Sequence, residues 1–448
     1  MGVYKFIRSN LLAGGKTGLE AYFVLLVWAF FFFLWLPGHL QAQVEIFNIF
    51  MAIIPFVLPF LIGIVAYHLW YEYQWARRYG ETEHCVLEIK LPEEITQTPY
   101  AAELMLRGIY QTGETDTPLH EFLGATKPWF SLEIVSTEGR VHFYMWMRRR
   151  YKALVEAQIY AHYPTVQVVE VPDYTLSIPY DPAVVDVWAV EQKLQKPDPY
   201  PILTYVEAGL DEKGVKEEFK HDPQASLIEL LGSIKEGEHI WIQFVIRAHV
   251  AESYCPYALE ETHHHMNLRE WGQHEIETIA KKVTREKEDG TGSIVNYAGL
   301  TKGDRELIES IQNKLNKQPF EVGIRAVYIA RKDKSNSAPR IAIPSAFRSF
   351  EHGSEGRGLN GLAPIFWIGP FNFAWQDFMN TRRHMLWKRM YDAYVTRQFF
   401  YPPHKHRWII LNSEELATIY HFPGKVVRTP TLERMPSKRA EAPANLPI

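Results

Sequence analysis

Cysteine and excess positive charge are both scarce in this 448-residue chain, and each scarcity removes a class of protein. The chain has only two cysteines, Cys85 and Cys255, which excludes a scaffold held together by several disulfides. The formal net charge is −4, which argues against a protein that coats nucleic acid with its whole surface. A local basic patch remains compatible with this charge balance.

Complete catalytic motifs are also missing. Gly15–Thr17 ends like a phosphate-binding loop, but Asn10 stands where such a loop requires glycine. Gly356–Gly361 has the spacing of a dinucleotide fingerprint, yet a polar loop precedes it and a strand-like segment follows. The consecutive side chains of His263–His265, the one metal-like cluster, point in different directions. We therefore predict no catalytic residue, no cofactor and no metal, with a metal-dependent enzyme at these histidines as a minor alternative.

Two long runs without charge lie near the N-terminus, at residues 21–36 and 46–70, separated by a loop at 37–45. The second run is long enough for a helix that crosses a hydrocarbon core of about 30 Å, whereas the first is short. The loop has no Lys or Arg, and basic residues flank the two runs at Lys5, Arg8, Lys16, Arg77 and Arg78. The positive-inside rule then predicts a two-helix transmembrane hairpin in the inner (cytoplasmic) membrane, with the lipid bilayer as a partner and both termini cytoplasmic.

Two other interpretations of this N-terminal segment are weaker. A signal peptide would need a small-x-small cleavage site, and Leu40-Gln41-Ala42 is a poor one with a second apolar run directly behind it. A soluble helical hairpin would bury one stripe of each helix, but Phe30–Phe33 is apolar on every face. Pro55 and Pro59 are expected to kink the second helix.

The remainder of the chain predicts an α+β fold. Between residues 81 and 173, apolar and polar residues alternate as in strands, and the strands are interrupted by two segments of helical periodicity. Thr98-Pro99 is typical of a helix start, and Glu138-Gly139 of a hairpin turn. The resulting order, βαββαβ, predicts a ferredoxin-like domain.

Four further segments complete the predicted domain organisation. Residues 1–80 form the N-terminal segment with the two transmembrane helices. Residues 174–370 repeat part of the βαββαβ order and predict a second ferredoxin-like domain with a helical insertion. Residues 371–424 form an aromatic and basic helical region, in which Asn412 and Glu415 predict a capping box. Residues 425–448 are rich in proline and basic residues and are expected to be disordered.

The helix predicted between residues 375 and 399 interleaves basic residues with aromatic ones. This combination suits single-stranded nucleic acid or anionic phospholipid headgroups. The alternative is a core stripe of aromatic residues with a solvated basic face. The candidate contact residues for DNA or phospholipid are Arg382, Arg383, Lys388, Arg389 and Arg397.

Three stretches together resemble the membrane-anchored amino-terminal half of conjugative DNA-transfer or type IV secretion ATPases, particularly those of candidate-phylum bacteria (Patescibacteria). They are Gly139-Arg140-Val141-His142-Phe143 with the helix that follows it, Asp222-Pro223 to Gln243, and Leu411 to Gly424. The similarity covers about residues 20–447.

In those relatives a RecA-like motor follows the proline-rich stretch, whereas this chain ends at Ile448. The motor's ATP-binding residues have no matching positions, so ATP hydrolysis is not carried over. The resemblance implies a non-enzymatic inner-membrane anchor or adaptor of a DNA- or protein-translocation machine, working with a separate motor ATPase. A homo-oligomer is a further expectation, and a membrane-tethered nucleic-acid-binding protein is the alternative function.

Overall fold

The structure is a computed structural model of the chain, and it describes residues 40–92, 95–113, 124–211, 222–250, 268–281, 284–286, 293–295, 300–351, 360–366, 381–401, 406–424 and 434–435. The chain divides into two compact units. Unit 1 comprises residues 1–81, 117–125 and 373–382, and unit 2 comprises residues 82–116, 126–372 and 383–448.

The described part of unit 1 consists mainly of α3 (Leu40–Glu81), one helix of 42 residues that contains Pro55 and Pro59. Its middle is apolar, and most of the large apolar side chains that the structure describes there are exposed. Near its C-terminal end Trp75 is buried and stacks on Tyr79, with 5.4 Å between the ring centroids.

The predicted transmembrane hairpin is wrong. Across the described residues, no helix combines the length and the apolar character that a membrane crossing requires. The prediction treated residues 46–70 as a separate helix behind a loop, because this run lacks charged residues. In the structure the run is the middle of α3, which begins at Leu40 inside the predicted loop and continues to Glu81. The predicted multi-pass location in the inner membrane depended on this hairpin and is wrong for the same reason. The run at 21–36 lies outside the described residues.

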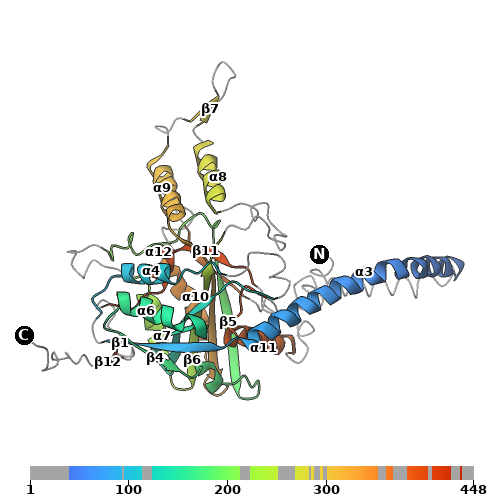
Figure 1. Cartoon of the computed structure of the whole chain (residues 1–448), viewed down its shortest axis with the longest axis horizontal. Coiled ribbons are helices and arrows are strands. Elements are labelled where there is room, and N and C mark those ends of the chain that lie inside the picture. The colour runs from blue at the N-terminus through green and yellow to red at the C-terminus, as the bar shows by residue number, and fades with distance from the viewer. Residues whose placement is uncertain are drawn as a thin grey trace, which may run out of the picture. The chain divides into compact units, whose positions relative to one another are not determined.

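Unit 2 is built on a ten-stranded sheet with the order β10-β5-β9-β6-β2-β3-β1-β12, in which β4 also pairs with β1 and β11 with β9 (Figure 1). Its strands are β1 (His84–Pro92), β2 (Phe130–Thr137), β3 (Arg140–Arg148), β4 (Gln167–Val171), β5 (Val185–Leu194), β6 (Glu238–Ala248), β9 (Pro319–Arg331), β10 (Leu362–Ile365), β11 (Ile409–Asn412) and β12 (Arg434–Met435). Every pairing is antiparallel except that of β12 with β1.

The predicted fold of two small ferredoxin-like modules behind a transmembrane hairpin is also wrong. Numbered within each half of the sheet, the strands β4-β1-β3-β2 and β10-β5-β9-β6 both follow the order 4-1-3-2. The halves are not separate modules, because β2 pairs with β6 along its whole length, from Phe130 opposite Ile246 to Thr137 opposite His239. β2 and β6 are edge strands of their own halves, and each pairs its outer backbone groups with the other strand. The predicted boundary at 173/174 falls inside one compact unit.

Helices cover both faces of this sheet. One face, here the core face, carries apolar side chains such as Leu132, Ile242 and Ile324, which form one cluster with residues of five helices. These helices are α4 (Pro99–Gly108), α6 (Lys152–His162), α7 (Ala225–Ser233), α10 (Ala338–Ala346) and α12 (Ser413–Ile419). The opposite face, here the α11 face, is covered by α11 (Thr381–Val395), whose Tyr394 packs on Trp241 with 5.4 Å between ring centroids.

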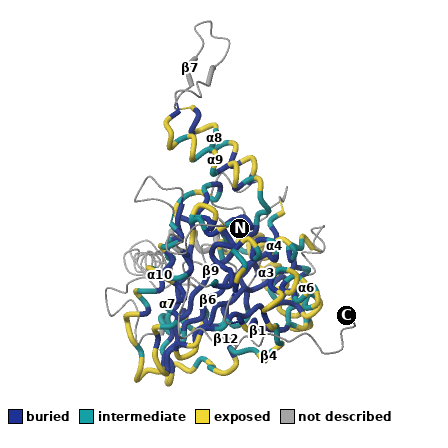
Figure 2. Tube along the Cα trace, turned by 90° about the vertical axis from the view of Figure 1, so that its left-hand side faces the viewer, coloured by how far each residue is buried: buried dark blue, intermediate teal, exposed yellow. Residues whose placement is uncertain are grey.

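Short elements and one insertion complete unit 2. Among the described residues, the 3₁₀ helices are η3 (Arg149–Tyr151), η4 (Tyr174–Ser177) and η7 (Phe347–Phe350). The insertion between β6 and β9 contains α8 (Leu268–Lys281), β7 (Thr284–Glu286), β8 (Ser293–Val295) and α9 (Lys302–Asn316). Ile279 and Ile311 form a small cluster between α8 and α9, while most other side chains of the two helices are exposed or half-buried (Figure 2).

Candidate functional site

Four polar side chains form a row across the middle of the α11 face. Glu133 on β2 lies opposite Gln243 on β6, Gln243 lies opposite Arg325 on β9, and Arg325 lies opposite Glu191 on β5. Residues directly opposite on neighbouring strands share a face, so the register alone brings these groups together. None of the four is more than 4% exposed. Charged residues buried to this extent must be paired, and each finds its partner within the fold.

Arg397 covers one end of this row from the segment that follows α11. The helix ends there with two capping hydrogen bonds, from the Arg397 N–H to the Tyr394 carbonyl and from the Gln398 N–H to the Ala393 carbonyl. This is a Schellman ending, in which glycine usually occupies the left-handed position. Here Arg397 occupies it with φ 53°, so the chain accepts a backbone conformation unfavourable to a side chain. This backbone turn directs the Arg397 guanidinium at the sheet.

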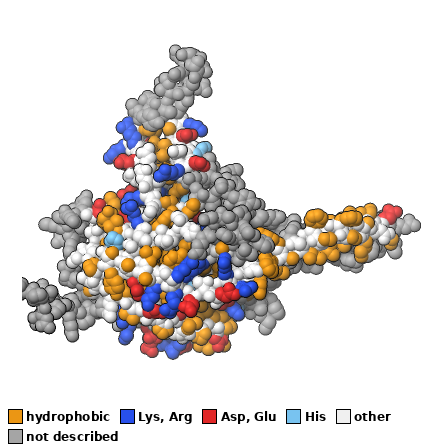
Figure 3. Space-filling model, viewed as in Figure 1, with side chains coloured by type: hydrophobic (Ala, Val, Ile, Leu, Met, Phe, Trp, Pro, Cys, Tyr) orange, Lys and Arg blue, Asp and Glu red, His pale blue; other side chains and the backbone are white. Residues whose placement is uncertain are grey.

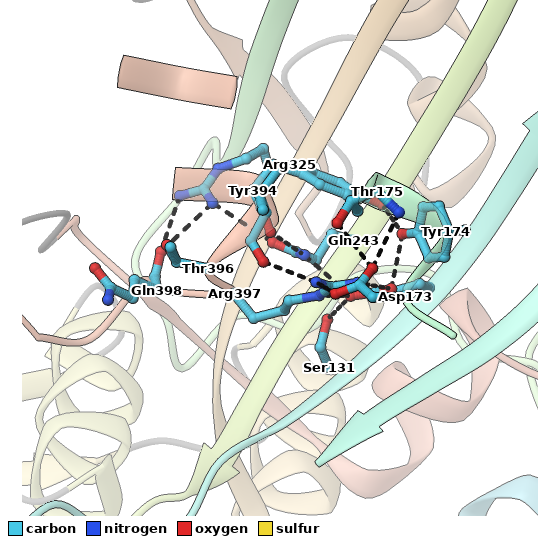
Figure 4. Close-up of polar contacts among 12 residues, drawn as sticks. Ser131, Asp173, Tyr174, Thr175, Gln243, Arg325, Tyr394, Thr396, Arg397 and Gln398 are labelled. Carbon is cyan, nitrogen blue, oxygen red and sulfur yellow. Dashed lines mark hydrogen bonds and ion pairs between the residues drawn. The ribbon is translucent and has the colours of Figure 1, made fainter. Parts of the chain in front are cut away.

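The Arg397 guanidinium bridges two carboxylates (Figure 4). Its Nε donates to Glu133 Oε1 at 3.0 Å, and its Nη2 donates to Glu133 Oε2 at 3.3 Å and to Asp173 Oδ1 at 2.9 Å. The Tyr174 hydroxyl donates to Glu133 Oε2 and lies 2.7 Å from the Tyr394 hydroxyl. Charge-assisted, forked contacts of this kind are the strong class of hydrogen bond.

The electrostatics of this cluster keep its charges fixed. Burial opposes the charge of Arg397, but Glu133 and Asp173 outweigh that cost and hold its pKa well above the ordinary value. Burial also favours neutral Asp173, and the Arg397 guanidinium outweighs it, so the pKa of this carboxyl lies below its usual range. Burial raises the pKa of Tyr174 and Tyr394 well above that of an ordinary phenol, and both stay neutral.

The other end of the row holds the next residues of the same segment. Arg325 donates from Nε and Nη2 to Glu191 at 3.1 and 3.0 Å and from Nη2 to the Gln398 carbonyl at 3.3 Å. The ring of Phe399 lies over this guanidinium, 5.2 Å away, and fills the space above Gly323. A Cβ at Gly323 would lie 2.4 Å from that ring, so only glycine leaves room for it.

A third arginine holds the end of the segment. Arg247 pairs with Glu321 and donates to the Tyr401 hydroxyl at 2.9 Å. Aromatic rings surround its guanidinium, with centroids at 4.4 Å for Phe400 and 5.3 Å for Tyr401. Three buried arginines therefore hold residues 394–401 against the sheet. Among the described residues, the charged groups of this site are paired with one another, and the Asp173 side chain is the most exposed of them at 25%.

A second buried ion cluster lies on the core face. Lys314, in the last turn of α9, binds Glu415 of α12 with 3.0 Å between Nζ and Oε2, and both side chains are 0% exposed. Nearby, Lys317 binds Glu103 at 3.0 Å and Glu414 at 2.6 Å. These contacts fix the base of the α8–α9 insertion to α4 and α12.

A family model described as a domain of unknown function, DUF8128, matches residues 73–435, which contain the whole sheet and both ion clusters. The chain belongs to the DUF8128 family. No curated protein matches it. Most of α3 precedes the matched residues, so the family is defined by the sheet and the helices on its two faces.

In this DUF8128 chain the five predicted contact residues do not share one surface. Lys388 is exposed on α11, whereas Arg382, Arg383 and Arg389 on the same helix are half-buried. The Arg383 guanidinium lies 6.0 Å from the centre of the Trp387 ring. Arg397 faces the sheet and is 0% exposed, because the helix ends before it. A surface contact through Arg397 does not fit this position.

The other sequence motifs fall mainly outside the described residues. Gly15–Thr17 and His263–His265 lie there, as does most of Gly356–Gly361. Its last two residues are described: the Asn360 side chain accepts from the Lys196 and Gly361 N–H groups, as in a structural loop anchor. In the described part of the DUF8128 fold, no group of three or more His, Cys, Asp or Glu is placed to hold a metal ion.

Sequence reasoning missed the charged residues that organise this DUF8128 fold. Glu133 lies in the strand-like stretch Phe130–Ile134 and Arg325 in Phe320–Ala330, and neither was singled out as a candidate site residue. A usable signal existed, because Glu133, Gln243 and Arg325 each lie between two apolar residues near the middle of a strand. These residues meet because of the register between the strands, and the sequence of a single strand does not specify that register.

Proposed function

We propose that this chain is a non-enzymatic adaptor of a type IV secretion-like or conjugative DNA- or protein-translocation machine, and that it works with a separate motor ATPase. The observation that carries the proposal is that the charged row is shielded from solvent. Arg397, Glu133 and Arg325 are at most 1% exposed, and Arg397 binds Glu133 while Arg325 binds Glu191. Such a row holds segments together. It supports a protein that acts through its surfaces.

The resemblance of residues 139–143, 222–243 and 411–424 to translocation ATPases supplies the machine in this proposal. These stretches include the first residues of β3, α7 with the first half of β6, and the α12 capping box, all of which belong to the sheet and its core face. The proposal therefore assigns the adaptor role to unit 2 and does not include a membrane anchor.

Binding to a motor tests this function. We expect the full chain to co-elute with the hexameric translocation ATPase encoded in the same genome, and a chain that lacks residues 425–448 to bind at least about tenfold more weakly, which corresponds to about 1.4 kcal/mol. A chain that lacks only residues 436–448 retains β12, which pairs with β1 at Leu91 and Pro92. It is the matched control, because it shortens the tail without removing this strand contact. Absence of a complex with any such ATPase at concentrations above about 10 µM contradicts the proposal.

A second candidate function is nucleic-acid binding through α11, which the exposed Lys388 and the contact of Arg383 with Trp387 favour. On the face that Figure 3 shows, by contrast, Lys and Arg side chains lie beside Asp and Glu, so no patch of one sign is visible there. Binding through α11 would therefore be local, involve few phosphates and exclude Arg397.

The salt dependence of binding tests this second function. If four cations of α11 contact single-stranded DNA, the logarithm of the binding constant falls with the logarithm of salt concentration with a slope of about −3. Reversing charge at Arg382, Arg383 and Arg389 should abolish binding, whereas Lys302→Glu on α9, where the side chain is 91% exposed, should leave it unchanged. Binding that is absent, independent of salt or insensitive to the triple variant removes this candidate.

A further inference from the structure

The outer edge of β4 presents backbone hydrogen-bonding groups away from the sheet. On its inner side β4 pairs with β1, and among the described residues no strand pairs with its outer side. The Val168 N–H donates to the Tyr160 hydroxyl at 3.2 Å, which shows that it points outward. Backbone groups alternate in direction along a strand, so Val168 and Glu170 face outward, and Val169 faces β1.

The opposite edge of the sheet differs in one decisive residue. Among the described residues its outermost strand is β10, and this strand contains Pro364, which has no N–H to donate. Proline on an edge strand is one of the means by which proteins prevent sheet-to-sheet pairing. The five residues of β4 include no proline and no lysine. Of these two edges, only that of β4 is suited to accept another strand.

We propose that the chain forms a two-fold symmetric dimer in which β4 pairs antiparallel with β4 of a second copy, centred on Val169. In this register Val168 lies opposite Glu170 of the partner subunit, and the outward groups of these two residues exchange both backbone hydrogen bonds. Val169 lies opposite Val169 of the partner subunit in a pair of the closer, non-hydrogen-bonded kind. The Tyr160 hydroxyl releases the Val168 N–H when the strands meet.

Charge complementarity favours a second copy as the occupant. Antiparallel pairing about Val169 places no two like charges opposite each other, since the one charged residue of β4, Glu170, faces a valine. Glu170 is already neutralised within its own chain by Arg149 and Lys152, each at 2.6 Å. Val169 is half-buried, so its pairing removes apolar surface from water at the symmetry axis. With Pro364 on the other edge, such a dimer is closed and does not extend into a fibre.

A charge-swap experiment on the full chain tests the dimer. Sedimentation velocity should show a dimer for the natural sequence, and at least a tenfold rise in its dissociation constant for Val169→Lys and for Val169→Glu, because each places like charges face to face. An equimolar mixture of the two variants should restore the dimer, since opposite charges then meet across the axis. Circular dichroism should be unchanged, because Val169 is only half-buried.

Three outcomes overturn the proposal: a monomeric natural chain, an oligomer that persists in both variants, or folded variants whose mixture stays monomeric. Recovery in the mixture also distinguishes a lost interface from a lost fold, because a misfolded chain would not be rescued by another. The inference does not depend on the adaptor function, since a dimer can form whether or not a motor binds.

Discussion

Replacing Arg397 with alanine should lower the free energy of unfolding by about 3–5 kcal/mol, since removing one member of a buried ion pair leaves the other charge uncompensated. Glu133 is 0% exposed and would lose the forked contact that now neutralises it. Asp173 would lose the same partner but is partly exposed and can regain water. Chemical denaturation followed by tryptophan fluorescence measures the change, because Trp129 donates directly to the Arg397 carbonyl.

Two substitutions at the same position separate the ion pair from the backbone strain. Arg397→Gly relieves the positive φ of 53° yet removes the guanidinium, and we expect it to be nearly as destabilised as the alanine variant. Arg397→Lys keeps the charge but loses the fork, and an intermediate loss is expected. Lys388→Ala on the exposed side of α11 is the matched control and should change stability by less than about 0.5 kcal/mol. A loss below about 1 kcal/mol for Arg397→Ala contradicts a structural role for the row.

The buried pair on the core face should show large effects that cancel in part. Lys314→Met should cost about 3–5 kcal/mol, because it leaves the Glu415 carboxylate without its cation. Glu415 Oε2 also accepts from the Asn412 N–H at 2.8 Å and Oε1 from the Ile202 N–H at 2.9 Å, and glutamine, with a single oxygen, can keep one of these two bonds. The double variant Lys314→Met with Glu415→Gln should therefore avoid the unpaired carboxylate but leave one backbone N–H without an acceptor, and lie about 1–3 kcal/mol below the natural chain. A double variant that loses the sum of both single effects would show that the pair is not coupled.

The pH dependence of the Lys314→Met variant follows from the same carboxyl. Burial raises the pKa of Glu415 above that of an ordinary glutamate, even though Lys314 opposes the shift. The folded state then holds this proton more tightly than the unfolded state, so stability falls as pH rises from the unfolded pKa through the folded pKa. Removing Lys314 raises the folded pKa further, and the variant should lose more stability at about pH 8 than at about pH 5. The double variant, which has no carboxyl at 415, should lack this difference.

Local features of the fold were predictable from neighbouring residues. The hairpin turn at Glu138-Gly139 and the capping box of Asn412 and Glu415 are both confirmed. Each depends on residues within a few positions of one another, so the sequence signal and the structural cause coincide. The pairing of β2 with β6 joins residues more than a hundred positions apart. Periodicity indicates which residues of a strand share a face, but not which strands pair, and this is why two modules were predicted where one sheet exists.

The position of Arg397 shows the same limit at the level of one side chain. The basic face of the predicted helix was extended to residue 399, but α11 ends at Val395. Beyond that point the backbone turns through a positive φ, and the next side chain leaves the helical face and enters the sheet. A helix end of this kind is usually marked by glycine, and arginine in its place gave no sequence signal.

Hydrogen exchange of the full chain, with and without the motor ATPase, tests the adaptor function most directly. We expect slow and unchanged exchange at residues 131–133 and 394–398, because the closed row is structural, together with new protection at surface segments of unit 2 when the motor binds. Faster exchange or a ligand-dependent change within the row would contradict this account, and so would the absence of new protection anywhere in the chain.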